Sequence, residues 1–376
     1  MKTPSALLFI AALSLGRWTL PVSLARAESA PDGLWRAPVY VGGRDGYHTY
    51  RIPSLVVTSS GALLAFCEGR KDSPEDNGDI DILVKRSEDG GRVWSATRIV
   101  WDENGNKCGN PTAVVDRDTG RVWLFMCHSL AAASRSSIRD GESVGTPTVW
   151  VTHSDDDGLT WSPPCEVTRQ VQPPGARWDL VGPGAGIQLR HGPSAGRLVI
   201  PALGRDIVSD DHGQTWRISG LTPGKTSEAQ VAELADGRLL RAARPVENKE
   251  RHRVPLTLSA DQGATWSPLR YAEELITPVC QGSLIRHSSA GESERGVLLF
   301  SHPGSEKKRV RLTIHASDDG GETWPGAWVL HPGPAAYSCL ASLDGGEVGC
   351  LFECGEAIPR ERIDLARFRL PKMAAP

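Results

Sequence analysis

Charged residues stand at the ends of apolar, strand-like segments in several parts of this chain. Arg51 comes just before the apolar run 54–57, Arg70 ends another such run, and an acidic segment follows at residues 72–81. Guanidinium groups can bind a carboxylate through paired hydrogen bonds, and a carboxylic acid can donate or accept a proton during a reaction. These residue types would permit acid–base chemistry on an anionic substrate. A strand-end arginine and an acidic loop are equally typical of a solvated surface. The rest of the sequence must therefore distinguish a reactive site from an ordinary surface.

One eight-residue pattern organises the chain around these residues. The pattern S-x-D-x-G-x-T-W occurs five times, and its threonine is replaced only in the first copy, by Val93; the copies start at Ser87, Ser154, Ser209, Ser259 and Ser317. Aspartate can accept hydrogen bonds from backbone N–H groups just ahead, and glycine supplies a positive φ. Strand-type residues flank the copies. Each copy therefore predicts a β-hairpin, with the closing tryptophan buried between neighbouring units.

The spacing of the copies predicts the architecture. Successive copies start 50 to 67 residues apart, which fits four short strands with their loops. Residues 28–376 number 349, so six units of about 58 residues fit. We therefore expect an all-β fold, a six-bladed β-propeller with four-stranded antiparallel blades, one of which lacks the pattern. Residues 363–370 alternate like a strand, which we expect to close the ring against the first blade.

The N-terminus has the features of an export signal. An apolar run at residues 6–13 is followed by Ala25-Arg26-Ala27, so we predict a secretory signal peptide at 1–27. No linker divides residues 28–376, which we therefore expect to form a single domain. A disordered or anchoring N-terminus is the alternative. The apolar run is too short for a membrane span, and we expect an exported protein, secreted or periplasmic. Export permits disulfides, and Cys350 and Cys354 could form one, but the sequence does not fix the pairing of the eight cysteines.

The composition narrows the classes of ligand. The chain has 376 residues, 40 glycines and 27 prolines, which predicts many turns and few long helices. The formal net charge is −3, which argues against a protein that binds nucleic acid through bulk positive charge. A small anion bound by a few arginines remains compatible with this charge.

Further segments carry a resemblance to a known family. The eight-residue pattern resembles the Asp-box, or BNR repeat, of sialidases. Matching segments follow in the family's order: Tyr50-Arg51-Ile52-Pro53, residues 66–81, Gly182 to Leu189, Ser227 to Leu234, Leu239 to Arg244, residues 301–313, Tyr337-Ser338 and Phe352-Glu353. The chain thus resembles a bacterial-type exo-α-sialidase (neuraminidase) from about residue 40 to 355. His302, Arg311 and the Ala242-Ala243 pair depart from the family's asparagines.

The resemblance implies a role for particular residues. Asp76 matches the general acid/base, with Asp72 and Asp79 as alternatives in the same loop, while Glu228 matches the base and Tyr337 the nucleophile. Substrate-binding residues would be Arg51, Arg70, Arg244, Arg309 and Glu353, the last orienting Arg51. Arg241 is a weaker alternative to Arg244, and Glu233 is expected to be structural. Residues 182–189 would form a loop near the substrate, with Trp178 and Asp179 as further candidates.

The implied function is that of a retaining exo-α-sialidase, which removes terminal α-linked sialic acid from glycoconjugates without a cofactor or metal. Its partners would be sialylated glycoproteins, gangliosides and oligosaccharides. The alternatives are a trans-sialidase, a hydrolase of a related 2-keto-3-deoxy sugar acid, and a non-catalytic sialoglycan-binding propeller. Pure binding would need only the arginines, so the presence of Asp76, Glu228 and Tyr337 together favours catalysis.

Overall fold

The computed structural model describes residues 30–133, 135–140, 145–288 and 296–371. The signal peptide predicted at 1–27 lies outside these residues. Strands dominate the described chain, and its helical elements are short: α1 (Arg135–Asp140), α2 (Thr168–Val171) and the 3₁₀ turns Lys249–Arg251 and Asp344–Gly346. The all-β prediction is confirmed. None of the described helices has the length and apolar character needed to cross a membrane.

Hydrogen bonds join the described strands into four sheets. The seven-stranded sheet holds, in spatial order, β1 (Asp32–Val41), β24 (Arg362–Arg369), β23 (Val348–Cys354), β22 (Gly326–Ser342), β21 (Val310–Ser317), β20 (Val297–Pro303) and β19 (Ser283–His287). Its long central strand, β22, pairs with β21 through its first half and with β23 through its second.

The nine-stranded sheet follows the order β2 (Thr49–Val57), β3 (Leu63–Arg70), β4 (Ile80–Ser87), β6 (Lys107–Val115), β7 (Val122–Ser129), β8 (Thr148–Ser154) and β9 (Cys165–Glu166), with β5 (Arg98–Trp101) beside β4 and β10 (Gly184–Ala185) beside β6. A single residue pair, Ile80 with Lys107, joins its two halves. The hydrogen-bonded sheets therefore do not correspond one to one to four-stranded units.

Two smaller sheets have four strands each. One contains β11 (Ile187–Gln188), β12 (Leu198–Ala202), β13 (Arg205–Ser209) and β14 (Arg217–Leu221). The other contains β15 (Thr226–Glu233), β16 (Leu239–Pro245), β17 (Arg253–Ser259) and β18 (Arg270–Ile276). Neighbours along each sheet are antiparallel.

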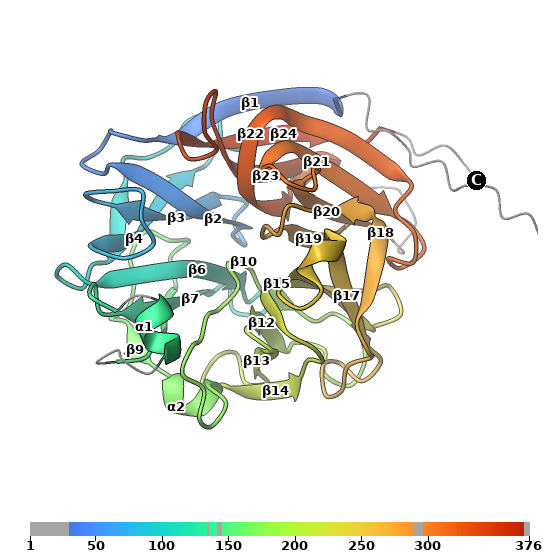
Figure 1. Cartoon of the computed structure of the whole chain (residues 1–376), viewed down its shortest axis with the longest axis horizontal. Coiled ribbons are helices and arrows are strands. Elements are labelled where there is room, and N and C mark those ends of the chain that lie inside the picture. Colours follow the sequence, from blue (N-terminus) through green and yellow to red (C-terminus); the bar gives the residue numbers. More distant parts are fainter. Residues whose placement is uncertain (1–29, 134, 141–144, 289–295, 372–376) are drawn as a thin grey trace, which may run out of the picture.

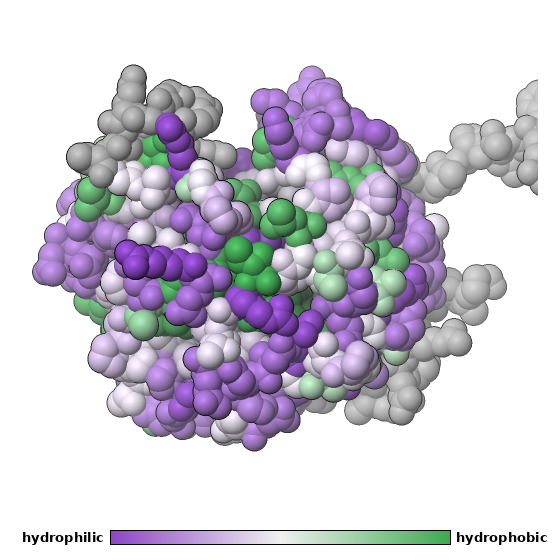
Figure 2. Space-filling model, turned by 90° about the horizontal axis from the view of Figure 1, so that it is seen from below, coloured by the Kyte–Doolittle hydropathy of each residue, from purple (hydrophilic) through white to green (hydrophobic). Residues whose placement is uncertain are grey.

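The sheets are arranged around a common centre (Figure 1), with β2, β10, β15 and β19 near the middle. Strand β2 contacts both β6 and β22, and β15 contacts β12 and β19, so the innermost strands are neighbours. Every residue of β15 is buried, as is every residue of β2 except the last. Apolar side chains fill the spaces between adjacent sheets. The surface seen in Figure 2 is mostly hydrophilic, with hydrophobic side chains gathered near its middle.

The repeated pattern forms the predicted hairpins. Its serine is the last residue of β4, β8, β13, β17 and β21, and each of these strands pairs with the next strand in sequence, β5, β9, β14, β18 and β22. In the third copy Ser209 Oγ donates to Asp211 (2.8 Å), while Thr215 donates to the same carboxylate through its N–H (2.9 Å) and its hydroxyl (2.6 Å). The other copies repeat the Ser–Asp bond.

The closing tryptophans are buried to different degrees. Trp216 and Trp324 are buried, and Trp216 packs edge-on against Phe125 of the neighbouring sheet, which confirms the expected position between units. The corresponding tryptophans of the other three copies, at 94, 161 and 266, are only half-buried.

Both ends of the described chain meet in one sheet. The predicted tail strand is confirmed as β24, which pairs antiparallel with β1. It therefore joins the first strand of the described chain and not the sheet that begins with β2. All eight cysteines are free thiols, seven of them buried, so Cys350 and Cys354 do not form the bridge considered above. Both lie inside β23.

Candidate functional site

The innermost strands share an irregularity where they line a pocket of about 200 Å³. The register of β2 shifts between Arg51 and Ser54, and that of β6 between Gly109 and Thr112; β15 shifts between Thr226 and Ala229, and β22 between Ala335 and Ser338. Such β-bulges turn side chains away from the regular alternation. The bulged segments carry Ile52, Asn110, Glu228 and Tyr337, all of which line the pocket.

The bulge in β2 is strained. Ile52 has a φ of 61°, a left-handed conformation that costs a β-branched residue of the order of 1–3 kcal/mol. Its N–H donates to Glu353 Oε1 at 2.9 Å. The bulge thus brings a backbone donor and the Arg51 side chain to the same carboxylate.

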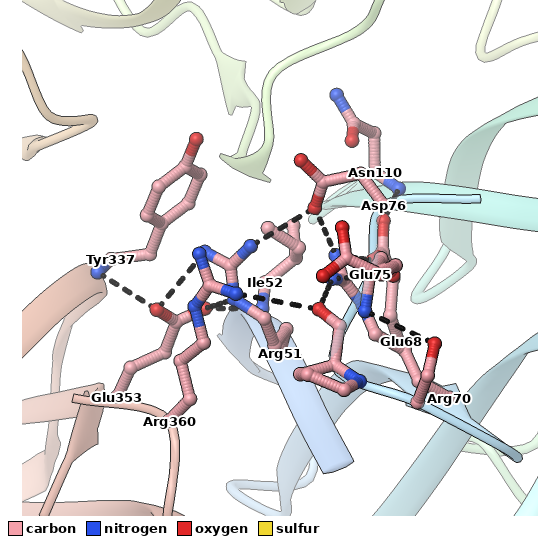
Figure 3. Close-up of polar contacts among 12 residues, drawn as sticks. Arg51, Ile52, Glu68, Arg70, Glu75, Asp76, Asn110, Tyr337, Glu353 and Arg360 are labelled. Carbon is pink, nitrogen blue, oxygen red and sulfur yellow. Dashed lines mark hydrogen bonds and ion pairs between the residues drawn. The ribbon is translucent and has the colours of Figure 1, made fainter. Parts of the chain in front are cut away.

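Arg51 lies between two carboxylates (Figure 3). Its Nε and Nη2 donate to Glu353 at 3.1 and 3.2 Å, and its Nη1 donates to Asp76 at 3.2 Å. Burial opposes the charged form of Arg51, but Glu353, Tyr337 and Asp76 together outweigh this effect and raise the pKa of the guanidinium. Glu353 is fully buried, so this charge is compensated only by groups that the protein itself supplies.

Tyr337 and Glu228 form a short hydrogen bond. The tyrosine Oη donates to Glu228 Oε1 at 2.6 Å, and Arg244 Nη1 lies 3.0 Å from both the Oη and the same carboxylate oxygen. Burial and the neighbouring Glu228 raise the pKa of Tyr337. Burial would also raise the pKa of Glu228, but Arg244 and the tyrosine hydroxyl lower it, so Glu228 is an ionised acceptor for the phenolic proton.

Two further arginine side chains face the Tyr337 ring. The guanidinium carbons of Arg51 and Arg309 lie 5.1 and 5.6 Å from the ring centroid. Together with Arg244, these groups place three positive charges around one phenol. Arginines in this arrangement can bind a carboxylate group immediately above the ring.

Asp76 faces the same pocket from the loop after β3. Its side chain is 70% exposed, and Oδ1 accepts from Arg70 Nη2 at 2.8 Å as well as from Arg51. The pocket walls partly desolvate this carboxyl, which opposes its ionisation, but the positive charges of Arg70, Arg51 and Lys107 outweigh this effect and lower the pKa of Asp76 to about 2. The two alternatives in this loop are placed differently: Asp79 pairs with Lys71, and Asp72 does not line the pocket.

Arg70 also holds the loop in place. Its Nη1 donates to the carbonyls of Pro74 and Glu75 at 2.6 and 2.8 Å, and its Nε and Nη2 bond to the buried Glu68. Arg70 therefore reaches the pocket and fixes the backbone just before Asp76. The structure brings all eight predicted site residues together: Arg51, Arg70, Asp76, Glu228, Arg244, Arg309 and Tyr337 line the pocket, and Glu353 supports them from beneath.

Comparison with known proteins classifies the chain. The family described as "BNR repeat-like domain" matches residues 61–350. A sialidase of Micromonospora viridifaciens is 36% identical over 370 residues, covering 92% of this chain and 56% of that protein. An exo-α-sialidase of Aspergillus fumigatus is 32% identical, covering 82% of this chain and 79% of the fungal protein.

This chain belongs to the sialidase family of glycoside hydrolases. Its fold agrees: a solved Hadza microbial sialidase is 32% identical, has a TM-score of 0.79 and covers 90% of this chain and 69% of its own. The chain spans little more than half the length of the Micromonospora sialidase.

Other residues of this sialidase-family chain have structural positions. Arg241, the weaker alternative to Arg244, is fully buried and pairs with Asp206, away from the pocket. Glu233 accepts the backbone N–H groups of Arg190 and His191, which agrees with the predicted structural role. Trp178 and Asp179 line the pocket, but the Asp179 carboxylate is held by the buried Arg205 at 2.7 and 2.8 Å.

Several pocket residues were not found from the sequence. Glu68, Lys107, Asn110 and Arg360 also line the pocket, and Lys107 Nζ donates to the Asp76 carbonyl at 2.8 Å. A signal did exist for Glu68. It is a charged residue inside an apolar strand, two positions before Arg70, and therefore on the same face of β3.

Proposed function

We propose that this chain is a retaining exo-α-sialidase that hydrolyses terminal α-linked sialic acid from glycoconjugates. One observation carries the proposal: the Tyr337 hydroxyl donates to Glu228 at 2.6 Å inside a pocket lined with arginines. A tyrosine paired with a general base is an activated nucleophile. Sialidases with a tyrosine nucleophile are a recognised exception among glycosidases, most of which use two carboxylates.

The arginines would select and place the substrate. A sialoside carries a carboxylate directly on its anomeric carbon, so binding this group between Arg51, Arg244 and Arg309 would set that carbon over Tyr337. These three arginines would explain how a chain of net charge −3 can bind an anionic sugar. A neutral phenol also avoids the repulsion that a carboxylate nucleophile would meet from the substrate's own carboxylate.

In the first step, the Tyr337 oxygen would attack the anomeric carbon while its proton passes to Glu228. Asp76 would give a proton to the glycosidic oxygen as the bond to the leaving group breaks. In the second step, Asp76 would take a proton from water, the water oxygen would attack the same carbon, and Tyr337 would leave and recover its proton from Glu228. Two displacements at one carbon retain its configuration.

Asp76 must gain a proton before it can act as the acid. In the free protein its pKa is about 2 because Arg70 and Arg51 outweigh the effect of burial, so the carboxyl is ionised near neutral pH. A substrate carboxylate bound by Arg51 would neutralise part of this positive charge. The same ion pair would bind the sugar and raise the pKa of Asp76 towards the range needed for proton transfer.

We further propose that the sheets form six four-stranded blades. Pairing supports the grouping β2–β5, β6–β9, β11–β14, β15–β18, β19–β22 and β22–β24 with β1. The last group takes its outer strand from the beginning of the chain, so it needs no hairpin there. This explains why five copies of the pattern would serve six blades. We also propose that residues 1–27 are a signal peptide that directs export.

Release of a fluorogenic aglycone from an α-sialoside tests the activity. Wild type should turn over, and Tyr337→Phe should lose about a thousandfold or more in kcat because the nucleophile is absent. Tyr271→Phe is the matched control, since the Tyr271 hydroxyl bonds Asn248 and lies outside the pocket.

NMR of the first-formed product tests the stereochemistry, which should be the α-anomer. A galactoside acceptor in the same assay separates hydrolysis from transfer. Absence of turnover by folded wild type on any α-sialoside, or full activity of Tyr337→Phe, would refute the proposal.

A further inference from the structure

A second cavity, of about 760 Å³, lies at the other end of the innermost strands. The first pocket is lined by Arg51 of β2 and Glu228 of β15, whereas this cavity is lined by Val57 and Glu233, further along the same strands. A strand rises about 3.3 Å per residue, so the six residues from Arg51 to Val57 separate the two sites by about 20 Å. The cavity is therefore distinct from the sialidase pocket.

Three arginines from three different sheets line this second cavity. Arg117 follows β6, Arg190 follows β11, and Arg286 belongs to β19. Their positions thus depend on the fold and not on a local sequence run. None of the three makes an ion pair with a residue in the described part of the chain.

The three guanidinium groups are held differently. Nη2 of Arg117 donates to the carbonyl of Gln188 at 3.1 Å. Nη1 of Arg286 is buried and has no hydrogen-bond partner among the described residues. The guanidinium group of Arg190 likewise has no hydrogen-bond partner among the described residues; only its backbone N–H is bonded, to Glu233. A buried donor without a partner is costly unless a ligand or water satisfies it.

The side chains that line the cavity carry more positive than negative charge. Burial, followed by the charge of Arg190, lowers the pKa of Arg117, with Asp118, Glu233 and Asp116 opposing this effect. Burial likewise lowers the pKa of Arg286, with Glu233 opposing this effect and Arg190 adding to it. The Glu233 carboxylate already accepts two backbone N–H groups at 2.8 Å each. With Asp344, the lining holds two carboxylates against three guanidinium groups.

We propose that this cavity is a second binding site, for an oxyanion group of the carboxylate, sulfate or phosphate type carried by a small polar molecule. Arg190 and Arg286 would bind the group through their free N–H donors, and Arg117 would add positive charge at the rim. Guanidinium groups match the oxygen spacing of all three anions. The volume is within the usual range for small-molecule sites. The site does not depend on sialidase activity.

Crystals of the full chain soaked in sodium selenate test the location directly. We expect an anomalous selenium peak within hydrogen-bond distance of Arg190 and Arg286, in addition to any peak at the first pocket. Soaks that add inorganic phosphate or N-acetylneuraminate distinguish the sources. Loss of the cavity peak with one competitor assigns the site to that anion, and loss with neither assigns it to the sulfate type.

Equilibrium dialysis with radiolabelled sulfate at constant ionic strength measures the affinity. The double variant Arg190→Gln/Arg286→Gln should bind at this cavity at least tenfold more weakly than wild type. Arg217→Gln/Arg251→Gln is the matched control, because both arginines are about half exposed and line neither cavity. Thermal unfolding confirms that both variants fold.

Two results would overturn the proposal. One is a selenate peak at the first pocket with none at the cavity. The other is equal sulfate binding by the arginine double variant and wild type. A cavity peak that appears only at molar selenate, with no saturable binding in dialysis, would show an adventitious ion only and would also refute it.

Discussion

The Asp-box hairpins and the central pocket both use carboxylates, but they use them in opposite ways. In a hairpin such as 209–216, the aspartate accepts hydrogen bonds only from a serine and a threonine of the same eight residues. In the pocket, Glu353 binds an arginine 302 positions away, and Glu228 binds a tyrosine 109 positions away. The Ser–Asp–Thr bonds of a hairpin form within eight residues, whereas the bonds of the pocket form only when distant segments of the chain have met.

This difference separates what stabilises the protein from what the proposed reaction needs. Hairpin carboxylates have their hydrogen bonds satisfied by near neighbours. The pocket instead keeps charges close together, with an ionised Asp76 between two arginines. It also holds Ile52 in a strained backbone conformation. Both features are typical of functional sites. Substitutions at the centre should therefore affect both stability and activity, while substitutions in a hairpin should affect stability alone.

The largest effect is expected for Glu353→Gln. The side chain keeps its shape but loses the charge that compensates the buried Arg51, so the free energy of unfolding should fall by about 3–5 kcal/mol. Activity should fall as well, because Arg51 would be less well oriented towards the substrate. Urea unfolding and the fluorogenic assay measure the two effects. Glu356→Gln, at an exposed position, is the control, and equal stability of the two variants would contradict the central role of Glu353.

A smaller, pH-dependent effect is expected for Asp156→Asn in the second hairpin. Burial opposes ionisation, but the Thr160 hydroxyl and N–H outweigh it and lower the pKa of Asp156 to about 2. Since the unfolded pKa is about 3.9, this stabilisation is present above that pH and is lost as the pH falls through about 2. The variant should therefore lose stability less steeply than wild type between pH 4 and 2.

Urea midpoints at pH 5, 4, 3 and 2 measure this slope. Asp157→Asn is the matched control, because the side chain of Asp157 takes no part in the hairpin's hydrogen bonds and its left-handed φ of 56° suits asparagine. Neither variant should change kcat at neutral pH. Parallel stability curves for Asp156→Asn and wild type would contradict the prediction.

The smallest effect is expected for Val93→Thr, which should be stabilising. The first hairpin keeps the N–H bond from Val93 to Asp89 at 2.9 Å but lacks the hydroxyl bond that the other four copies form at 2.6 Å. One added hydrogen bond should raise the free energy of unfolding by about 0.5–1 kcal/mol. Thermal unfolding measures it, with Val246→Thr, an exposed valine outside the five copies of the eight-residue pattern, as control. An equal shift in both variants would show that the gain is not due to the hairpin.

The sequence predicted the hairpins well because their hydrogen bonds are local. The side chains of the eight residues carry the whole pattern, so reading them was sufficient. The meeting of Arg51, Asp76, Glu228 and Tyr337 was predicted only through the order of family motifs, and their catalytic roles remain predictions. Trp178 and Asp179 do line the pocket, although Asp179 is held by Arg205.

The remaining features depend on long-range geometry that no local pattern records. The bulges at Ile52, Asn110, Glu228 and Tyr337 lie where the inner strands line the pocket. A shift in strand register cannot be recognised from the types of residue in a segment. Arg360 reaches the pocket from the turn before β24. The number of strands in each hydrogen-bonded sheet was likewise beyond prediction, because it depends on the Ile80–Lys107 bridge and on the continuity of β22.

The pairing of β1 with β24 sets the order in which the molecule can be completed. Asp32 pairs with Arg369, so the outer strand of this sheet has no partner until residues 362–369 have been synthesised. Contacts that join distant segments slow folding, because a long loop must close before they form. A nascent chain stopped before β24 would carry β1 with its edge unpaired. We expect the pairing of β1 with β24 to form late in folding, and to separate first when Asp32 and Arg369 are pulled apart.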